Sequence, residues 1–122
     1  MPIEITPRPI NTAERAILEK LLSVDFVGVE ELRLQIDFCE VTGIWGQDSV
    51  SVDLRTSDSS PQSPAGTGPI PVRTSVLGES GSLEGEILIW VTDGYLSALE
   101  YAWYGETMPR ELPPAERVTI DE

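Results

Sequence analysis

The dipeptide Asp93-Gly94 lies between two apolar runs, "ILIWV" and "YLSAL", and constrains the fold more than any other feature of this sequence. Asp-Gly favours the left-handed backbone of a tight two-residue turn, so it predicts a β-hairpin with strands over 85–92 and 95–103. The predicted register pairs Val91 with Leu96, Ile89 with Ala98, and Leu88 with Leu99. A helix over 96–104 is the alternative, because Leu96, Leu99 and Trp103 also have helical spacing.

Alternation along these strands sorts their side chains onto two faces of the hairpin. The first face is aliphatic and consists of Ile87, Ile89, Val91, Leu96 and Ala98. The second is mainly aromatic and consists of Leu88, Trp90, Leu99, Tyr101 and Trp103. An antiparallel sheet with one helix has one covered face, so we expect the helix on the aliphatic face and the aromatic face left open.

The segment "NTAERAILEKLLS" predicts a helix over residues 11–23. Asn11 can cap its N-terminus, and Glu14 three residues later completes a capping box. Its apolar residues form one stripe: Ala13, Ile17, Leu18, Leu21 and Leu22. The opposite face is polar and carries Arg15, Glu19 and Lys20.

Alternating hydrophobicity predicts three more strands, over 31–38, 49–55 and 70–77. In the first of them, the residues that alternate with polar ones are Leu32, Leu34, Ile36 and Phe38. The glycines within 39–48 predict a turn between the first two strands. Residues 56–69 are rich in Ser, Pro and Gly, a composition that predicts a mobile loop.

Prolines dominate both ends of the sequence. The first nine residues therefore predict an extended arm, and residues 105–122 an extended tail over the surface. We expect a single α+β domain over 1–122, with one N-terminal helix packed on an antiparallel sheet of about five strands.

Eight Lys and Arg residues stand against 21 Asp and Glu, which gives a net charge of −13. Such a charge disfavours nucleic acid and anionic membrane and speeds encounter with a basic protein. Histidine is absent, Cys39 is the only cysteine, and no apolar run resembles a signal peptide. We therefore expect a cytoplasmic protein without a disulfide or a Cys/His metal site. The oligomeric state stays open.

Catalytic motifs are not apparent. Without His, a Ser or Cys nucleophile lacks its usual base, and "GESGS" at 78–82 has the wrong spacing for a nucleophile elbow. We expect no enzyme, no catalytic residue and no cofactor, with Cys39 a small packed side chain. Glu100 leaves one alternative open. It continues the aliphatic face and could be a buried carboxylate of a small enzyme or ligand-binding domain, or a simple hydrogen-bond acceptor.

The aromatic face has acidic residues around it and no basic residue between Arg73 and Arg110. Trp and Tyr supply much of the binding energy at protein interfaces, so this face predicts a partner site. The predicted partner-binding residues are Leu88, Trp90, Leu99, Tyr101, Trp103, Glu84, Glu86, Asp93 and Glu106. The alternative is a second small core, formed by Trp90 and Trp103 beneath the tail.

The stretch "GEILIWVTDGYLSALEYAWY" and the following "PRELPP", within residues 85–114, resemble small actinobacterial proteins of unassigned function associated with toxin-immunity neighbourhoods. The resemblance rests on Gly85, Glu86, Trp90, Asp93, Gly94, Leu96, Glu100, Tyr101 and Trp103. Immunity proteins are typically small, acidic, cytosolic α+β domains that bind and occlude a toxin's active site. The resemblance thus implies a protein that neutralises a cognate toxin, and the basic partner would be that toxin's domain. An acidic subunit of a larger assembly is a further alternative.

Overall fold

The predicted hairpin lies at the centre of the sheet. The computed structural model describes residues 2–121, in which β6 (Leu83–Thr92) and β7 (Tyr95–Trp103) pair in antiparallel fashion. Asp93 (φ 50°) and Gly94 (φ 81°) both adopt the left-handed backbone that the turn requires. The α+β class and the hairpin are confirmed, and residues 96–104 do not form a helix.

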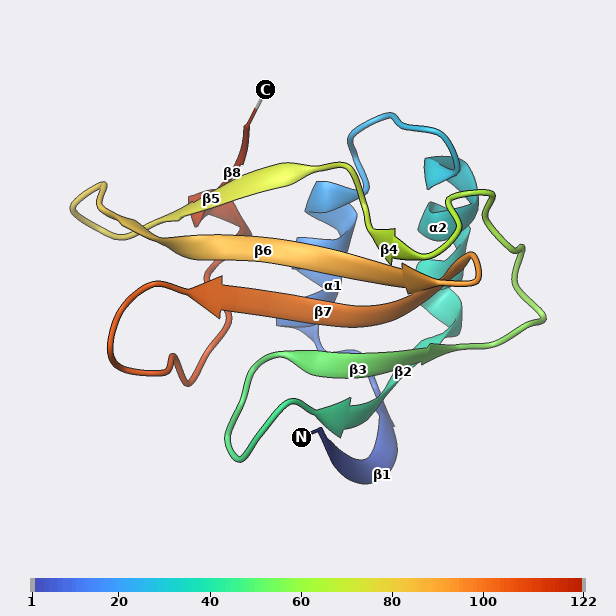
Figure 1. The fold of residues 1–122 in the computed structure, drawn as a ribbon, viewed down its shortest axis with the longest axis horizontal. Helices are drawn as coiled ribbons and strands as arrows, with labels where there is room; N and C mark the ends of the chain where they lie inside the picture. Colours follow the sequence, from blue (N-terminus) through green and yellow to red (C-terminus); the bar gives the residue numbers. More distant parts are fainter. Residues whose placement is uncertain (1, 122) are drawn as a thin grey trace.

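Six further strands extend the sheet on both sides of this hairpin (Figure 1). They are β1 (Ile3–Pro9), β2 (Cys39–Ile44), β3 (Val52–Thr56), β4 (Gly68–Pro69), β5 (Arg73–Leu77) and β8 (Val118–Asp121). The order across the sheet is β1-β2-β3-β7-β6-β5-β8, with β4 also paired to β6, and neighbouring strands are antiparallel. The described residues thus hold eight strands where about five were expected; β3 and β5 correspond to the predicted strands 49–55 and 70–77.

The unexpected strands come from segments in which proline or glycine obscures the pattern. The N-terminal arm forms β1 at one edge of the sheet, a position that tolerates proline because one side of the strand needs no partner. The turn predicted over 39–48 forms only in the second half of that range; the prediction is wrong for the first half, which is β2, and Gly43 lies at an irregularity of the β2–β3 pairing. The tail ends in β8, which pairs with β5.

The N-terminal helix α1 (Thr12–Leu21) forms as its sequence predicts. The Asn11 side chain accepts a hydrogen bond from the Glu14 N–H, and the Glu14 carboxylate accepts one from the Asn11 N–H, both at 2.8 Å. This reciprocal pair is the predicted capping box. Four members of the apolar stripe are buried: Ile17, Leu18, Leu21 and Leu22.

The strand predicted over 31–38 is wrong. The structure has a second helix, α2 (Val29–Gln35), continued by a 3₁₀ turn over Ile36–Phe38. Leu, Glu, Arg and Gln are good helix formers, and Val29, Leu32 and Ile36 recur at helical spacing on the buried side. Two apolar residues that the alternation would have buried are exposed instead, Leu34 by 62% and Phe38 by 44%.

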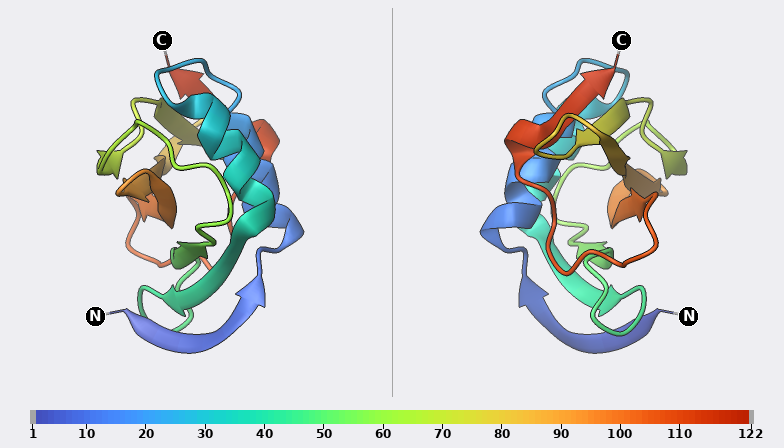
Figure 2. Two further views of the ribbon diagram at one scale, coloured as in Figure 1. Left: turned by 90° about the vertical axis from the view of Figure 1, so that its right-hand side faces the viewer. Right: turned by 90° about the vertical axis from the view of Figure 1, so that its left-hand side faces the viewer.

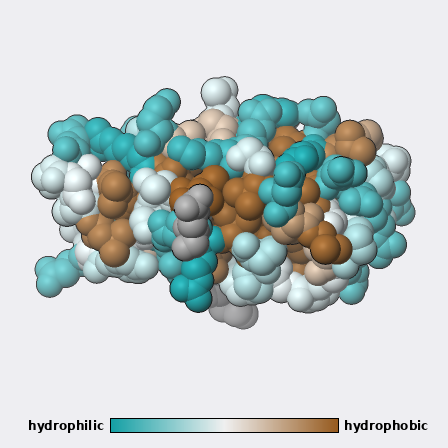
Figure 3. Space-filling view, turned by 90° about the horizontal axis from the view of Figure 1, so that it is seen from above, coloured by the Kyte–Doolittle hydropathy of each residue, from teal (hydrophilic) through white to brown (hydrophobic). Residues whose placement is uncertain are grey.

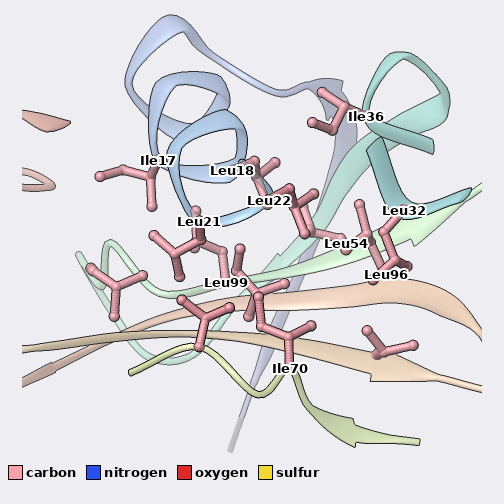
Figure 4. Close-up of a cluster of buried hydrophobic side chains, with 14 of the residues drawn as sticks. Ile17, Leu18, Leu21, Leu22, Leu32, Ile36, Leu54, Ile70, Leu96 and Leu99 are labelled. Carbon is pink, nitrogen blue, oxygen red and sulfur yellow. The ribbon is translucent and has the colours of Figure 1, made fainter. Parts of the chain in front are cut away.

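The sheet curls around α1 and α2, so that the two helices occupy its concave side (Figure 2). Apolar side chains from both helices and from the inner face of the sheet meet there in one core (Figure 4). The outer face of β6 and β7 points away from the helices.

Helix α1 is attached to both edges of the curled sheet. At its start, Glu14 is buried, and its carboxylate accepts hydrogen bonds from both terminal nitrogens of Arg8, on β1, at 2.8 and 3.0 Å. Toward its end, the Lys20 ammonium donates to the Ala115 carbonyl at 2.7 Å, in the turn before β8. Polar contacts thus hold the helix over the core from either side.

The fully buried carboxamide of Gln35 connects three segments that are distant in sequence. Its nitrogen donates to the carbonyls of Pro61 and Gly94, both at 2.8 Å, and its oxygen accepts from the Leu96 N–H at 2.9 Å. The segment 56–69, for which we predict mobility, is therefore attached to α2 and to the hairpin turn. The Ser63 N–H also donates to the Gly94 carbonyl at 2.9 Å. The mobility of this segment stays a prediction.

Two buried side-chain hydroxyls form hydrogen bonds with backbone groups of the central hairpin. The Ser51 hydroxyl accepts from the Tyr101 N–H at 2.9 Å, next to the short β3–β7 pairing. The Thr74 hydroxyl accepts from the Ile87 N–H at 2.7 Å and donates to the Ile87 carbonyl at 2.9 Å. Side chains thus satisfy strand groups that the irregular sheet would leave unpaired.

We expect Gln35→Ala to lower the free energy of unfolding by about 3 kcal/mol or more, because each buried polar group left unpaired costs roughly 1–3 kcal/mol. Denaturant titration measures the change. Gln47→Ala, at an exposed position in the β2–β3 connection, is the control and should stay within about 0.5 kcal/mol of the parent. Equal stability of the two variants would contradict the structural role of Gln35.

Candidate functional site

A bulge in β7 changes which side chains face the core. Trp90 pairs with Ala98 and Val91 pairs with Leu96, so Ser97 is an extra residue in β7. The predicted pair Val91–Leu96 is confirmed. The other two predicted pairs are wrong, since Ile89 lies opposite Leu99 and Leu88 lies opposite Glu100. An insertion of one residue moves each following side chain to the opposite face of the strand, and this happens in β7 to the residues after Ser97.

The prediction that Trp90, Tyr101 and Trp103 share one face is therefore wrong. Tyr101 (5% exposed) belongs to the core, and so does Leu99 (0%), so neither faces outward from the sheet. Trp103 lies two residues beyond Tyr101 on the same side of β7 and is 37% exposed. Trp90 is on the opposite side, so Trp90 and Trp103 form no second core.

On the outer face of the sheet, tryptophans donate to carboxylates. The indole N–H of Trp90 donates to Glu100 at 3.0 Å, and that of Trp45, which the sequence patterns did not single out, donates to Asp53 at 3.1 Å. Leu88 and Glu86 are half-buried on the same strand as Trp90. Glu100 is thus an outward carboxylate that accepts a hydrogen bond, and it does not continue the aliphatic face as predicted.

A pocket of about 500 Å³ is lined by residues from the end of the hairpin where β6 begins and β7 ends. In Figure 1 this end of the two strands lies on the left. It brings together four of the predicted partner residues, Glu84, Tyr101, Trp103 and Glu106. The residues that complete it are Leu83, Tyr104, Gly105, Thr107 and Pro109. We refer to this site as the acidic aromatic pocket. Asp93 is exposed in the turn at the other end of the hairpin and does not take part.

The central hairpin positions this pocket. Gly85 lies opposite Trp103, and the Tyr104 N–H donates to the Glu84 carbonyl at 2.9 Å, so the strands stay paired up to the pocket. A side chain at position 85 would meet the Tyr101 ring and the β7 backbone, because a Cβ there would lie 2.8 Å from Tyr101 Cε1. Glycine thus lets the Tyr101 ring lie against β6.

The pocket is negative and aromatic, and no basic residue lines it. Burial raises the pKa of Tyr101, and the nearby negative charge of Glu84 raises it further. Desolvation also raises the pKa of Tyr104, as do the charge of Glu86 and the hydrogen bond from the Tyr104 hydroxyl to that carboxylate at 3.4 Å. Both phenols keep their protons at neutral pH. Such a site offers aromatic faces and acceptor oxygens, the groups that attract a cation.

A second hollow, of about 680 Å³, lies on the upper side of the molecule, where apolar residues gather in the middle of Figure 3. Its apolar lining includes Ile70 and Val72, just before β5, Ile120 in β8, and Val24 in the connection after α1. Charged residues of both signs also line it, Arg73, Glu86 and Asp121, so its electrostatics select no class of partner.

Cys39 and the possibility of a metal site were also considered from the sequence. Cys39 is half-buried beside Thr56, and burial raises the pKa of its thiol, which disfavours the reactive thiolate. Among residues 2–121, no three His, Cys, Asp or Glu side chains are grouped to hold a metal ion. Within the same residues, no helix is long and apolar enough to cross a membrane.

Sequence reasoning missed five residues that line the pocket: Leu83, Tyr104, Gly105, Thr107 and Pro109. The signal for Tyr104 was its position directly after Trp103, at the end of a strand and before Gly105. Comparison with protein-family models, curated proteins and solved structures finds no match for this chain.

We expect Glu84→Gln to lower the pKa of Tyr101 while leaving it above the ordinary value near 10, because burial, the larger cause, persists. A pH titration of the Tyr101 ring resonances measures the change, and Glu19→Gln on the exposed side of α1 is the control. Because folding raises this pKa, the phenol's contribution to stability is complete below about pH 10 and is lost as the pH rises through the raised value. An unchanged pKa in Glu84→Gln would show that the carboxylate does not act on the phenol.

Proposed function

We propose that this chain is a binding protein that takes a basic protein partner at the acidic aromatic pocket. The observation that carries the proposal is a pocket with three aromatic residues and two carboxylates, without a basic residue, on a chain of net charge −13. Aromatic side chains dominate interface energetics, and acidic ones select a partner of opposite charge. The pocket contains half of the acidic side chains that the sequence predicted for the partner site, Glu84 and Glu106.

We further propose that the partner is a bacterial toxin domain and that binding neutralises it. The support for this step is the resemblance of residues 85–114 to proteins of toxin-immunity neighbourhoods. Three residues on which the resemblance rests, Gly85, Tyr101 and Trp103, shape the pocket: Gly85 gives space to the Tyr101 ring, and Tyr101 and Trp103 line the cavity. An immunity protein acts by occupying its toxin, so it needs a binding surface and no catalytic group.

We expect Trp103→Ala to weaken partner binding by about 2 kcal/mol or more, roughly 30-fold, while melting stays near that of the parent. The partner is captured from the source organism on the parent chain, and its affinity for each variant is then measured. Leu34→Ala, which truncates an exposed apolar residue on α2, is the matched control and should bind as the parent does. Equal loss in both variants, or none in Trp103→Ala, would contradict the pocket as the partner site.

The toxin step has its own test. The captured protein, produced alone in a bacterial host, should arrest growth, and co-production of the parent chain should restore it. Trp103→Ala should fail to restore growth at equal protein level, whereas Leu34→Ala should succeed. A captured protein that leaves growth unaffected would contradict the toxin step and leave the binding proposal standing.

The net charge leads to a kinetic expectation. Association with the basic partner should slow markedly as salt rises from about 10 to 500 mM, because ions screen long-range attraction, while dissociation changes less. Stopped-flow or surface-based kinetics measure both rates. An on-rate that ignores ionic strength would mean that the acidity serves solubility and does not guide the encounter.

A further inference from the structure

The hydroxyl of Tyr101 is a polar group without a partner in the acidic aromatic pocket. Tyr101 is 5% exposed, and its backbone groups contact Ser51, yet its hydroxyl makes no hydrogen bond to any of residues 2–121. Across those residues, no fully buried side-chain nitrogen or oxygen lacks a partner. The Tyr101 oxygen therefore adjoins open space, and the space that this residue lines is the pocket.

The groups around that space suit a ligand that donates hydrogen bonds and carries positive charge. Ionised Glu84 and Glu106 only accept hydrogen bonds, and the neutral phenol of Tyr101 has acceptor capacity as well. Trp103 and Tyr104 are 37% and 56% exposed and offer aromatic surface to a cation. A small metal ion would gain nothing from the rings, because hard cations are held by several oxygen ligands.

Resting on the proposed function, we infer that the acidic aromatic pocket receives one arginine side chain of the partner. The guanidinium is planar and delocalised, so it stacks on an aromatic ring while its edge donates to acceptors in several directions. The pocket offers that combination, with the rings of Trp103 and Tyr104 together with the oxygens of Tyr101, Glu84 and Glu106. An ammonium group is a more strongly hydrated point charge and matches a flat aromatic site less well.

The test uses three small probes on the whole chain: N-acetyl-L-arginine amide, the lysine analogue, and the citrulline analogue, which has the shape of arginine without its charge. Titration is followed by the indole N–H resonance of Trp103, with those of Trp45 and Trp90 as internal controls. We expect the arginine probe to shift the Trp103 signal saturably, the lysine probe to bind at least several-fold more weakly, and the citrulline probe not to bind. Lysine binding equal to or tighter than arginine, or equal citrulline binding, would overturn the inference.

Two tyrosine variants test the role of the hydroxyl. Tyr101→Phe keeps the ring and removes only the oxygen, so it should weaken the arginine probe roughly fivefold, the loss expected for one hydrogen bond. Tyr95→Phe, beside the turn at the far end of the hairpin, should leave the affinity unchanged. Melting curves show that both variants are folded before they are titrated. Unchanged affinity in folded Tyr101→Phe would overturn the part assigned to the hydroxyl.

The outcomes separate this inference from the proposed function. If Trp103→Ala abolishes partner binding but the arginine probe does not bind the parent chain, the inference is wrong and the proposed function stands. If the arginine probe binds at Trp103 but the captured partner ignores Trp103→Ala, the pocket chemistry stands and the proposed function is wrong.

Discussion

The buried carboxamide of Gln35 is the interaction on which the arrangement of this fold most depends. A helix, a long irregular segment and a hairpin turn meet at this side chain, which comes from the helix and pairs with one backbone group of the segment and two of the hairpin. An apolar residue at this position would fill the space but leave the Pro61 carbonyl and the Leu96 N–H without this partner. The polar contact therefore both stabilises the fold and fixes the position of α2 against the hairpin. The hairpin in turn holds the acidic aromatic pocket at its other end.

Sequence patterns predicted the fold well where local chemistry and burial agree. The Asp93-Gly94 turn and the Asn11–Glu14 capping box are encoded within a few residues, so both are read directly from the sequence. The prediction failed at 31–38, where period-two alternation and helical spacing coexist and only packing against the core decides between them. It also failed for β1, β2 and β8, which become strands because distant segments provide their partners.

The candidate site shows the same division. The stretch around Trp103 was correctly singled out as rich in aromatic residues, and its acidic neighbours Glu84 and Glu106 do line the pocket with it. The assignment of faces failed at Ser97, because it assumed unbroken alternation along β7, whereas the bulge shifts the phase so that Leu99 and Tyr101 face the core and Glu100 faces outward. That single extra residue moved Leu99 and Tyr101 into the core and left Trp90 outside. Composition indicated the region of the candidate pocket, and strand register determined which residues line it.

Tyr101 belongs both to the hydrophobic core and to the pocket, whereas Glu84 and Glu106 are exposed. Its backbone is further fixed by the hydroxyl of Ser51, directly before β3. Mutation at Tyr101 is therefore constrained by folding, while the two carboxylates can be replaced at little cost to stability. Under the proposed function, exchange of the acidic residues would change partner preference, while the cavity itself is inherited with the fold. A protein and its partner could then diverge through changes in surface charge alone, with every intermediate variant still able to fold.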